Sequence, residues 1–307
     1  MTQPDAAATP EPVSTAAVLA AAAVGGAAVM AVELSAVRLV APWFGSSLAV
    51  WTNVLGVVLT ALALGYLLGA RLARGRRPVR ALALLFALSS GLVASTPWLA
   101  DPICGAFLPD RVALSEAGAL IVNGSLAVSL ALFLPSATLL GAIGPLSVEA
   151  VQRRRGGHAG TAGGQVLCVS TLGSLAGTFG TSHLLLPELG VAGTFLAAGV
   201  TLAGLGAVLA LGTRRRAEAA LALLLGAAAL VELLRDVDPT ASADPERTVL
   251  AERDSAYQRV RVVELSDGSR RLEVNERTDS FQSVWFPEPG LLPAGFYYND
   301  FALPAWW

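Results

Sequence analysis

The sequence predicts an α-helical integral membrane bundle of about seven transmembrane helices, followed by a small C-terminal domain rich in β-hairpins. Its 307 residues are 54% hydrophobic and 14% charged, with a mean hydropathy of +0.61, whereas soluble domains carry about 25% charged residues. Apolar stretches of about 18 to 25 residues, long enough to cross a bilayer as helices, recur up to Leu234. Beyond Leu234 the sequence becomes polar and strand-like. Together these observations exclude a soluble globule.

The apolar stretches place the helices along the chain. They lie near residues 16–40, 48–70, 80–100, 117–140, 162–186, 189–212 and 217–234. Residues 1–15 form a Pro/Ala-rich disordered lead that lacks the positive start of a signal peptide. Glycines four residues apart, Gly65 and Gly69 and again Gly173 and Gly177, predict helices in close backbone contact. Pro135 and Pro145 predict a break in the fourth helix.

Arginine clusters predict the topology. All 21 basic residues are arginine, and clusters at residues 71–80, 153–155 and 214–216 follow the second, fourth and sixth segments. The positive-inside rule places these loops and the N-terminus in the cytoplasm of a bacterial-type inner (plasma) membrane. A seventh span then carries the C-terminal domain outside. If segment 217–234 lies along the interface instead, that domain is cytoplasmic.

The C-terminal part is predicted to be a linker, 235–247, and a small β-domain, 248–307. Residues 257–265 alternate in polarity, 266–269 supply a tight turn, and 270–276 follow as a second strand, which together indicate a β-hairpin. Residues 281–286 and 296–298 are further strand-like pieces. A unit this small buries little apolar surface, so we expect it to need the membrane domain or a partner to stay folded.

Polar side chains within the apolar segments are the candidates for function in the bundle. Glu33 is the first, because an ionisable group at membrane depth is costly unless it faces the bundle interior or a water-filled path. Arg38 lies five residues on, about 140° around the helix, so a simple helical ion pair is not expected. Asn53 and Asn123 are further candidates. The alternative for Glu33 is a structural role near the outer interface, bonded to Asn53 or to a loop amide.

The sequence contains no recognisable catalytic, metal or nucleotide motif. Cys104 and Cys168 lack the spacing of a zinc site, so no metal is expected. The net charge of -2 gives no electrostatic case for nucleic acid. Because no glycine-rich turn follows the C-terminal strands, no cofactor site is expected in this chain, and no residue is assigned as catalytic.

Four stretches of the membrane region resemble a known family. They are VELSAVRLVAPWFGSSLAVWTNVLG (32–56), GYLLGARLARGRR (65–77), LLGAIGPLSVEAV (139–151) and STLGSLAGTFGTSHLLLPELG (170–190). With them the chain resembles the fused membrane/spermidine synthase-like proteins, in which a major-facilitator-like membrane region precedes a polyamine aminopropyltransferase domain. GARLARGRR also resembles the helix 2–3 loop of major-facilitator transporters, with Ala73 and Arg74 where an acidic residue is usual.

The resemblance implies roles for residues of the C-terminal part. SAYQRVRVVE and YYNDFALPAWW resemble the small N-terminal β-domain of spermidine synthases. By this resemblance Gln258 contacts the co-substrate decarboxylated S-adenosylmethionine, and Tyr298 and Asp300 border the donor and amine pockets. Asn299 stands where the family has histidine. The family continues into a Rossmann-like domain with the cofactor loop and the catalytic base, which these 307 residues do not contain.

The expected function is therefore the membrane anchor and substrate lid of a spermidine synthase-like transferase, inactive alone. The chain is then a fragment, or one half of a split enzyme. Its expected partners are the lipid bilayer, a separately encoded Rossmann-type catalytic domain and a second copy in a homo-oligomer. Two alternatives remain, a transporter-like bundle for a small amine or metabolite and a non-catalytic scaffold. The transporter interpretation depends on Glu33 and on the broken fourth helix.

Overall fold

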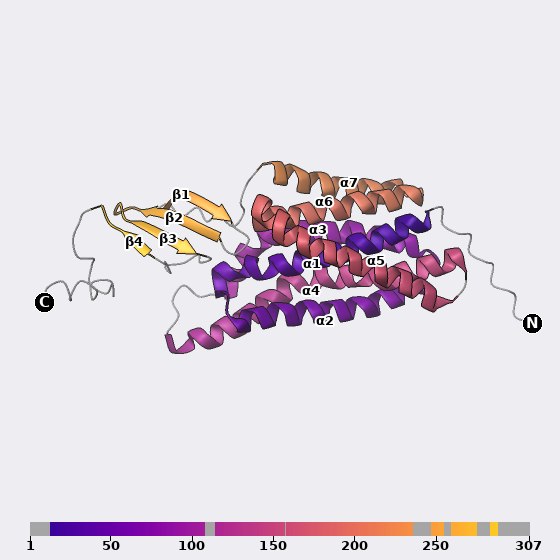
Figure 1. Ribbon diagram of the computed structural model, residues 1–307, viewed down its shortest axis with the longest axis horizontal. Coiled ribbons are helices and arrows are strands. Elements are labelled where there is room, and N and C mark those ends of the chain that lie inside the picture. Colours follow the sequence, from indigo (N-terminus) through magenta and orange to yellow (C-terminus); the bar gives the residue numbers. More distant parts are fainter. Residues whose placement is uncertain are drawn as a thin grey trace, which may run out of the picture. The chain divides into compact units, whose positions relative to one another are not determined.

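The computed structural model describes residues 13–107, 114–156, 158–235, 247–254, 259–274 and 283–287. The chain divides into two compact units, Met1–Ala241 and Ser242–Trp307. This boundary falls inside the expected linker 235–247. In the described residues the first unit is helical and the second is a sheet (Figure 1).

The first unit is a bundle of long helices. They are α1 (Thr15–Phe44), α2 (Leu48–Ala73), α3 (Pro78–Phe107), α4 (Leu114–Arg155), α5 (Ala159–Gly180), the π-helix η1 (Thr181–Leu185), α6 (Leu186–Gly212) and α7 (Arg216–Leu234). Six stretches of the described chain are long and apolar enough to cross a membrane, with α5, η1 and α6 counting as one stretch of 54 residues. The prediction of a helical bundle of the membrane type is confirmed.

Local signals explain where the helices begin and end. The hydroxyl oxygens of Ser14 and Ser47 accept hydrogen bonds from the third residue beyond them, at 3.2 Å and 3.4 Å, and so cap α1 and α2. Pro78 opens α3, where its missing N–H leaves no bond unmade. Gly45 ends α1 with a φ of 74°, a left-handed conformation that glycine adopts without strain.

Two predicted helices were too short, and the predicted break in the fourth is wrong. α3 extends to Phe107, and α4 runs unbroken from Leu114 to Arg155 with Pro135 and Pro145 inside it. Membrane helices tolerate proline because neighbouring helices and hydroxyl side chains can satisfy the freed backbone groups. The predicted segments end where the apolar residues end. Good helix formers, such as those of 149–155, continue the helix beyond that point.

The gap predicted between 162–186 and 189–212 is replaced by a π-helix and a kink. The helix continues through η1 into α6, and only Gly190, with φ 67° and ψ -173°, leaves helical geometry. Gly177 before the kink and Thr201 after it line the same cavity, although 24 residues of straight helix would separate them by about 36 Å. The chain therefore folds back on itself at Gly190, as the separate courses of α5 and α6 in Figure 1 show.

Close contacts at glycines give the relative directions of the helices. Each helix pair has two such contacts. If the residue numbers on both helices increase from one contact to the other, the two helices are parallel. If the number increases on one helix and decreases on the other, they are antiparallel. The contacts are Gly173 to Ala23 and Gly177 to Ala27, Gly65 to Thr138 and Gly69 to Ala142, Gly25 to Ile143 and Gly124 to Phe44, Gly199 to Ala94 and Gly206 to Phe86, and Gly226 to Ala203 and Gly193 to Leu233. By these contacts α1 is parallel to α5 and α2 to α4, whereas α1 is antiparallel to α4, and α6 to both α3 and α7. With the fold-back at Gly190, successive helices alternate in direction from α1 to α7.

The three arginine clusters lie at one end of the bundle. The guanidinium of Arg153, at the end of α4, donates to the carbonyl oxygen of Gly75 between α2 and α3 at 2.8 Å. Arg80, at the start of α3, pairs with Glu218, at the start of α7, at 2.7 Å. Gly212, at the end of α6, lies against Val13 just before α1. The loops that carry the clusters therefore share the end at which α1 begins.

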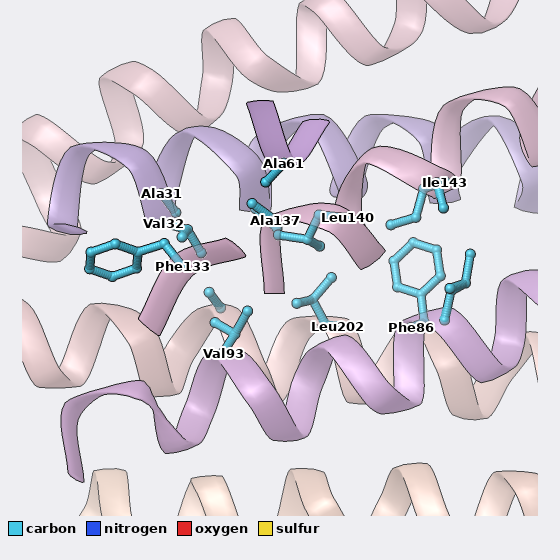
Figure 2. Packing of buried hydrophobic residues seen from close by; sticks show 14 of the residues in the cluster. Ala31, Val32, Ala61, Phe86, Val93, Phe133, Ala137, Leu140, Ile143 and Leu202 are labelled. Carbon is cyan, nitrogen blue, oxygen red and sulfur yellow. The ribbon is translucent and has the colours of Figure 1, made fainter. Parts of the chain in front are cut away.

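Small residues and aliphatic side chains form the core of the bundle. A methyl group added to Gly69 or Gly177 would lie 2.5 Å or 2.6 Å from a carbonyl oxygen of the neighbouring helix, so the predicted close contact at these glycine pairs is confirmed. Figure 2 shows Val32, Ala61, Phe86, Ile143 and Leu202, from five different helices, in one buried cluster. Large apolar side chains also cover the outside, among them Leu59, Leu67, Leu167, Leu224 and Leu234. Such a surface is compatible with contact to a lipid bilayer.

The second unit contains a four-stranded antiparallel sheet. Its strands β1 (Arg247–Asp254), β2 (Arg259–Leu265), β3 (Arg270–Val274) and β4 (Ser283–Trp285) lie side by side in chain order. The predicted hairpin of β2 and β3 is confirmed, with Gly268 at φ 77° in its turn. The sequence did not identify β1 as a strand, and the predicted strand at 296–298 lies outside the described residues.

Candidate functional site

The two ionisable candidates of the bundle, Glu33 and Arg38, lie on α1. Glu33 is half-buried, about one helical turn past the middle of the helix. Within the described residues Glu33 has no hydrogen bond or ion pair, whereas Arg38 has a contact of its own. The two therefore form no ion pair, as their angular separation predicted. A carboxylate held in this way can bind a proton or a cation.

Asn53 joins α2 to α4. Its side-chain amide donates to the carbonyl oxygen of Val122 and to the hydroxyl oxygen of Ser125, both at 2.8 Å. Asn123, beside Val122, is exposed. The structure thus brings Asn53 and Asn123 to the same end of the α2–α4 pair. Because Glu33 makes no hydrogen bond within the described residues, and both amide hydrogens of Asn53 are used on α4, the suggested bond between Glu33 and Asn53 is wrong.

The three residues assigned by resemblance, Gln258, Tyr298 and Asp300, lie outside the described residues. β2 begins directly after Gln258. The register places Glu252, Arg261 and Glu273 opposite one another on β1, β2 and β3. Arg261 and Glu273 are 7% and 3% exposed, whereas Glu252 is exposed, so two charges of opposite sign are buried side by side on β2 and β3. The sequence did not predict this, since the alternation of residues 257–265 indicated a strand and not which of its side chains are buried.

A second charged row lies on the other face of the sheet. Arg270 pairs with Glu264 at 3.1 Å, and its guanidinium carbon lies 5.1 Å from the ring centre of Trp285. A cation over an indole ring is attracted by the electrons of the ring face. These contacts connect β2, β3 and β4. Both faces of the sheet therefore carry charged side chains.

Arg153 organises the basic end of the bundle. Its guanidinium pairs with Glu149 one turn earlier on α4 and donates to the carbonyl oxygens of Ala73 and Gly75, both at 2.8 Å. The last carbonyls of a helix lack partners within it and carry partial negative charge, so a guanidinium is favourable there. Positive-inside reasoning accounts for the cluster but could not assign this role to one member of it.

A cavity of about 270 Å³ lies among α1, α5, η1 and α6. Its lining residues are Val24, Ala27, Ala28, Ala31, Ala176, Gly177, Gly180, Thr181, Leu185, Ala197, Ala198 and Thr201. None of the predicted candidates Glu33, Arg38, Asn53 and Asn123 is among them. Small residues recur throughout the sequence, and no signal distinguishes these from the others, so the cavity could not have been found without the fold.

Groups that could hold a metal are absent from the described part of the chain. There, no three His, Cys, Asp or Glu side chains come together as metal ligands would. Cys104 is buried, Cys168 is exposed, and neither forms a disulfide.

Comparison with protein-family models, with curated proteins and with solved structures gives no match for this chain. The resemblance to the fused membrane/spermidine synthase-like proteins therefore stays a prediction.

Proposed function

We propose that the protein is a seven-pass membrane protein whose C-terminal sheet serves as the substrate lid of a spermidine synthase-like aminopropyltransferase. The observation that supports this is the order of its units. A helical bundle of the membrane type is followed along the chain by a small antiparallel sheet. The family that the chain resembles has the same order, with the membrane region first and the small β-domain of the synthase after it.

Seven passes, rather than six, are supported by the fold-back at Gly190. A single pass of 54 residues would be about 80 Å long, far more than the roughly 30 Å of a hydrocarbon core. The alternating directions of α1 to α7, which follow from their glycine contacts and from the fold-back at Gly190, support one crossing for each helix. α5 and α6 are then two passes joined by η1 and the kink.

The arginine clusters support a cytoplasmic N-terminus. They lie at one end of the bundle, the end at which α1 begins, and basic loops stay in the cytoplasm. α7 packs lengthwise, from Glu218 beside Arg80 to Leu233 beside Gly193, which supports a crossing rather than an interfacial helix. The C-terminal unit then lies outside the cytoplasm, so the proposed transfer requires the donor, a cytoplasmic metabolite, to be exported to that side.

The proposed chemistry needs groups that the 307 residues do not contain. Aminopropyl transfer requires a base within hydrogen-bond reach of the attacking amine and a site for decarboxylated S-adenosylmethionine. In the proposal a Rossmann-type domain supplies both, either further along the same protein or as a separate chain. The sheet closes over the donor through Gln258, and the bundle keeps the enzyme at the membrane.

The test is an assay of aminopropyl transfer from decarboxylated S-adenosylmethionine to putrescine, with the chain in nanodiscs. We expect turnover only when the Rossmann-type domain encoded downstream or elsewhere in the same genome is added. In that complex Gln258→Ala should raise the KM for the donor about ten-fold, the effect of losing one hydrogen bond of about 1.4 kcal/mol. Gln152→Ala, on α4, is the matched control and should change nothing. Turnover by the chain alone, or an unchanged donor KM in Gln258→Ala, would contradict the proposal.

Glu33 favours a second candidate, a transporter-like bundle for a small amine. Because α4 is unbroken, Glu33, half-buried and without a partner among the described residues, is its one remaining support. Uptake of labelled putrescine into proteoliposomes should then be lost in Glu33→Gln and kept in Glu149→Gln, which removes a carboxylate at the end of α4. Equal uptake by the parent and Glu33→Gln would reject this candidate.

A further inference from the structure

Many arginines at the basic end of the bundle have no protein partner. Arg153 is bonded to Glu149 and to two backbone carbonyls, but it is not typical of the end. Seven other arginines, six exposed and one half-buried, make no hydrogen bond or ion pair within the described residues: Arg71, Arg74, Arg76, Arg77, Arg214, Arg215 and Arg216. The positive-inside rule explains why this end is basic. It does not explain what these guanidinium groups bind.

The starts of α3 and α7 bring two groups of these arginines together. Arg80 and Glu218, each the third residue of its helix, pair at 2.7 Å. Residues 76–77 directly precede α3, and residues 214–216 lead into α7, so both groups flank this one contact. Arg80 itself donates through Nε, and its side chain is 41% exposed. Its terminal N–H groups make no hydrogen bond within the described residues and add to the same surface.

Little negative charge opposes these arginines. In the described residues of this end, the three clusters contain eleven arginines, and the carboxylates are those of Glu149 and Glu218. Glu149 is paired with Arg153. The side chain of Glu218 is only 12% exposed beside Arg80, so it is largely covered from an approaching ligand. The surface therefore attracts anions.

Exposed apolar side chains begin just below the arginines. Leu211 lies three residues before Arg214, and Leu88, Leu221 and Leu224 lie on the first turns of α3 and α7, all exposed. The two helices stay packed along this length, since a methyl group added to Gly91 on α3 would lie 3.4 Å from Leu225 on α7. A molecule that matches both parts of this surface has an anionic group beside the arginines and hydrocarbon beside the leucines. In a bilayer that molecule is an anionic phospholipid.

We infer that the starts of α3 and α7 bind the headgroup of an anionic phospholipid. Its phosphate lies among residues 76–77, Arg80 and residues 214–216, and its acyl chains contact the exposed leucines of α3 and α7. The fork of N–H donors of a guanidinium matches phosphate oxygens in geometry and charge. Phosphatidylcholine fits less well, because its choline cation is repelled by the same arginines. The site needs only the membrane bundle and does not depend on aminopropyl transfer.

The test is a lipid titration of the full chain in detergent micelles, with bound lipids counted by native mass spectrometry. Phosphatidylglycerol should bind more tightly than phosphatidylcholine with the same acyl chains. An arginine near an anionic lipid surface contributes about 1 kcal/mol, roughly five-fold in affinity. The double variant Arg76→Gln/Arg77→Gln should therefore raise the Kd for phosphatidylglycerol roughly five- to thirty-fold, according to whether one or both guanidinium groups contact the phosphate. The Kd for phosphatidylcholine should not change.

The matched control removes the same two charges elsewhere. Arg235→Gln/Arg253→Gln changes an arginine after α7, at its other end, and an exposed one on β1, and should leave the Kd for phosphatidylglycerol as in the parent. An equal loss of affinity in both double variants would show an effect of net charge and would overturn the inference. If Arg76→Gln/Arg77→Gln does not fold, Arg215→Gln/Arg216→Gln should give the same loss.

Two competitors distinguish a lipid from a soluble anion. Glycerol phosphate and inorganic phosphate carry the anionic group without the acyl chains, so at equal concentration neither should displace phosphatidylglycerol. Displacement by either would show a site for free phosphate and would overturn the assignment to a lipid. Equal affinity of the parent for phosphatidylglycerol and phosphatidylcholine would overturn it as well.

Discussion

Gly65 illustrates how a single atom sets the distance between two helices. A methyl group there would collide with the carbonyl oxygen of Thr138 and lie 2.8 Å from the α-carbon of Gly141. We expect Gly65→Ala to destabilise the bundle by about 1–3 kcal/mol, the usual effect of overpacking, and to lower the thermal midpoint of the purified protein. Gly56, also on α2, has nothing within 4 Å of the same position. Gly56→Ala should therefore raise the midpoint, because alanine favours the helix by about 0.5–1 kcal/mol. Equal midpoints in the two variants would contradict this account.

At the scale of residues, the sequence predicted contacts better than it predicted sites. Two glycines one turn apart can have few structural purposes in a membrane helix, so Gly65/Gly69 and Gly173/Gly177 identified real helix contacts. The unpartnered hydroxyl of Thr181 could not be identified in this way. Threonines in helices usually bond to their own backbone, and only the π-helix at 181–185 makes this one different. The roles of Asn53 and Arg153 likewise depend on which helix lies next to them.

At the scale of elements, the β2–β3 turn makes a prediction about pH. The side chain and the backbone N–H of Ser269 hydrogen-bond to Asp267, the latter at 2.8 Å, and these bonds lower the pKa of Asp267. The bonds favour the ionised carboxylate, so their contribution to the hairpin is present above the unfolded pKa of about 3.9 and is lost as the pH falls through the lower, folded pKa. The carboxyl carbon shift of Asp267, followed by NMR in the intact chain, should therefore titrate below 3.9. Ser269→Ala removes only the hydroxyl and should bring the pKa part of the way back. Titration of the parent at its ordinary value would show that the turn is not formed as described.

The sequence predicted those helices and strands whose positions are determined by the pattern of hydrophobic residues. Each apolar segment became a helix, because a backbone in hydrocarbon must satisfy its own hydrogen bonds. Helix ends outside the apolar segment obey other rules, so α4 continues to Arg155 past two prolines. The β2–β3 hairpin was visible because its turn residues lie between two alternating runs, whereas β1 begins in the predicted linker, where no such turn marks it.

At the scale of the whole molecule, the arrangement of the helices follows from a few backbone contacts. Glycines and alanines place α1 against α5, α2 against α4, and α6 against both α3 and α7. Because every pair has a defined direction, the arginine clusters at residues 71–80, 153–155 and 214–216 share one end. The positions of the arginines alone predicted that these three loops lie on the same side of the membrane. The sequence could not predict which helices pack against one another, because an alanine-rich helix presents small residues on every face.

The number of passes and the side of the C-terminal unit can be decided together by fusions at three points. Alkaline phosphatase, active only outside the cytoplasm, and a fluorescent protein, active only inside, are fused in turn after Gly156, after Arg216 and after Trp307. If α5 and α6 are two passes, the first two points lie on the same side, and both should fluoresce because they follow arginine clusters. A single pass through 159–212 would place them on opposite sides. The third point should give phosphatase activity, because α7 then carries the sheet outside. Fluorescence without phosphatase activity after Trp307 would show that α7 does not cross, and would leave the sheet where decarboxylated S-adenosylmethionine, a cytoplasmic metabolite, can reach it.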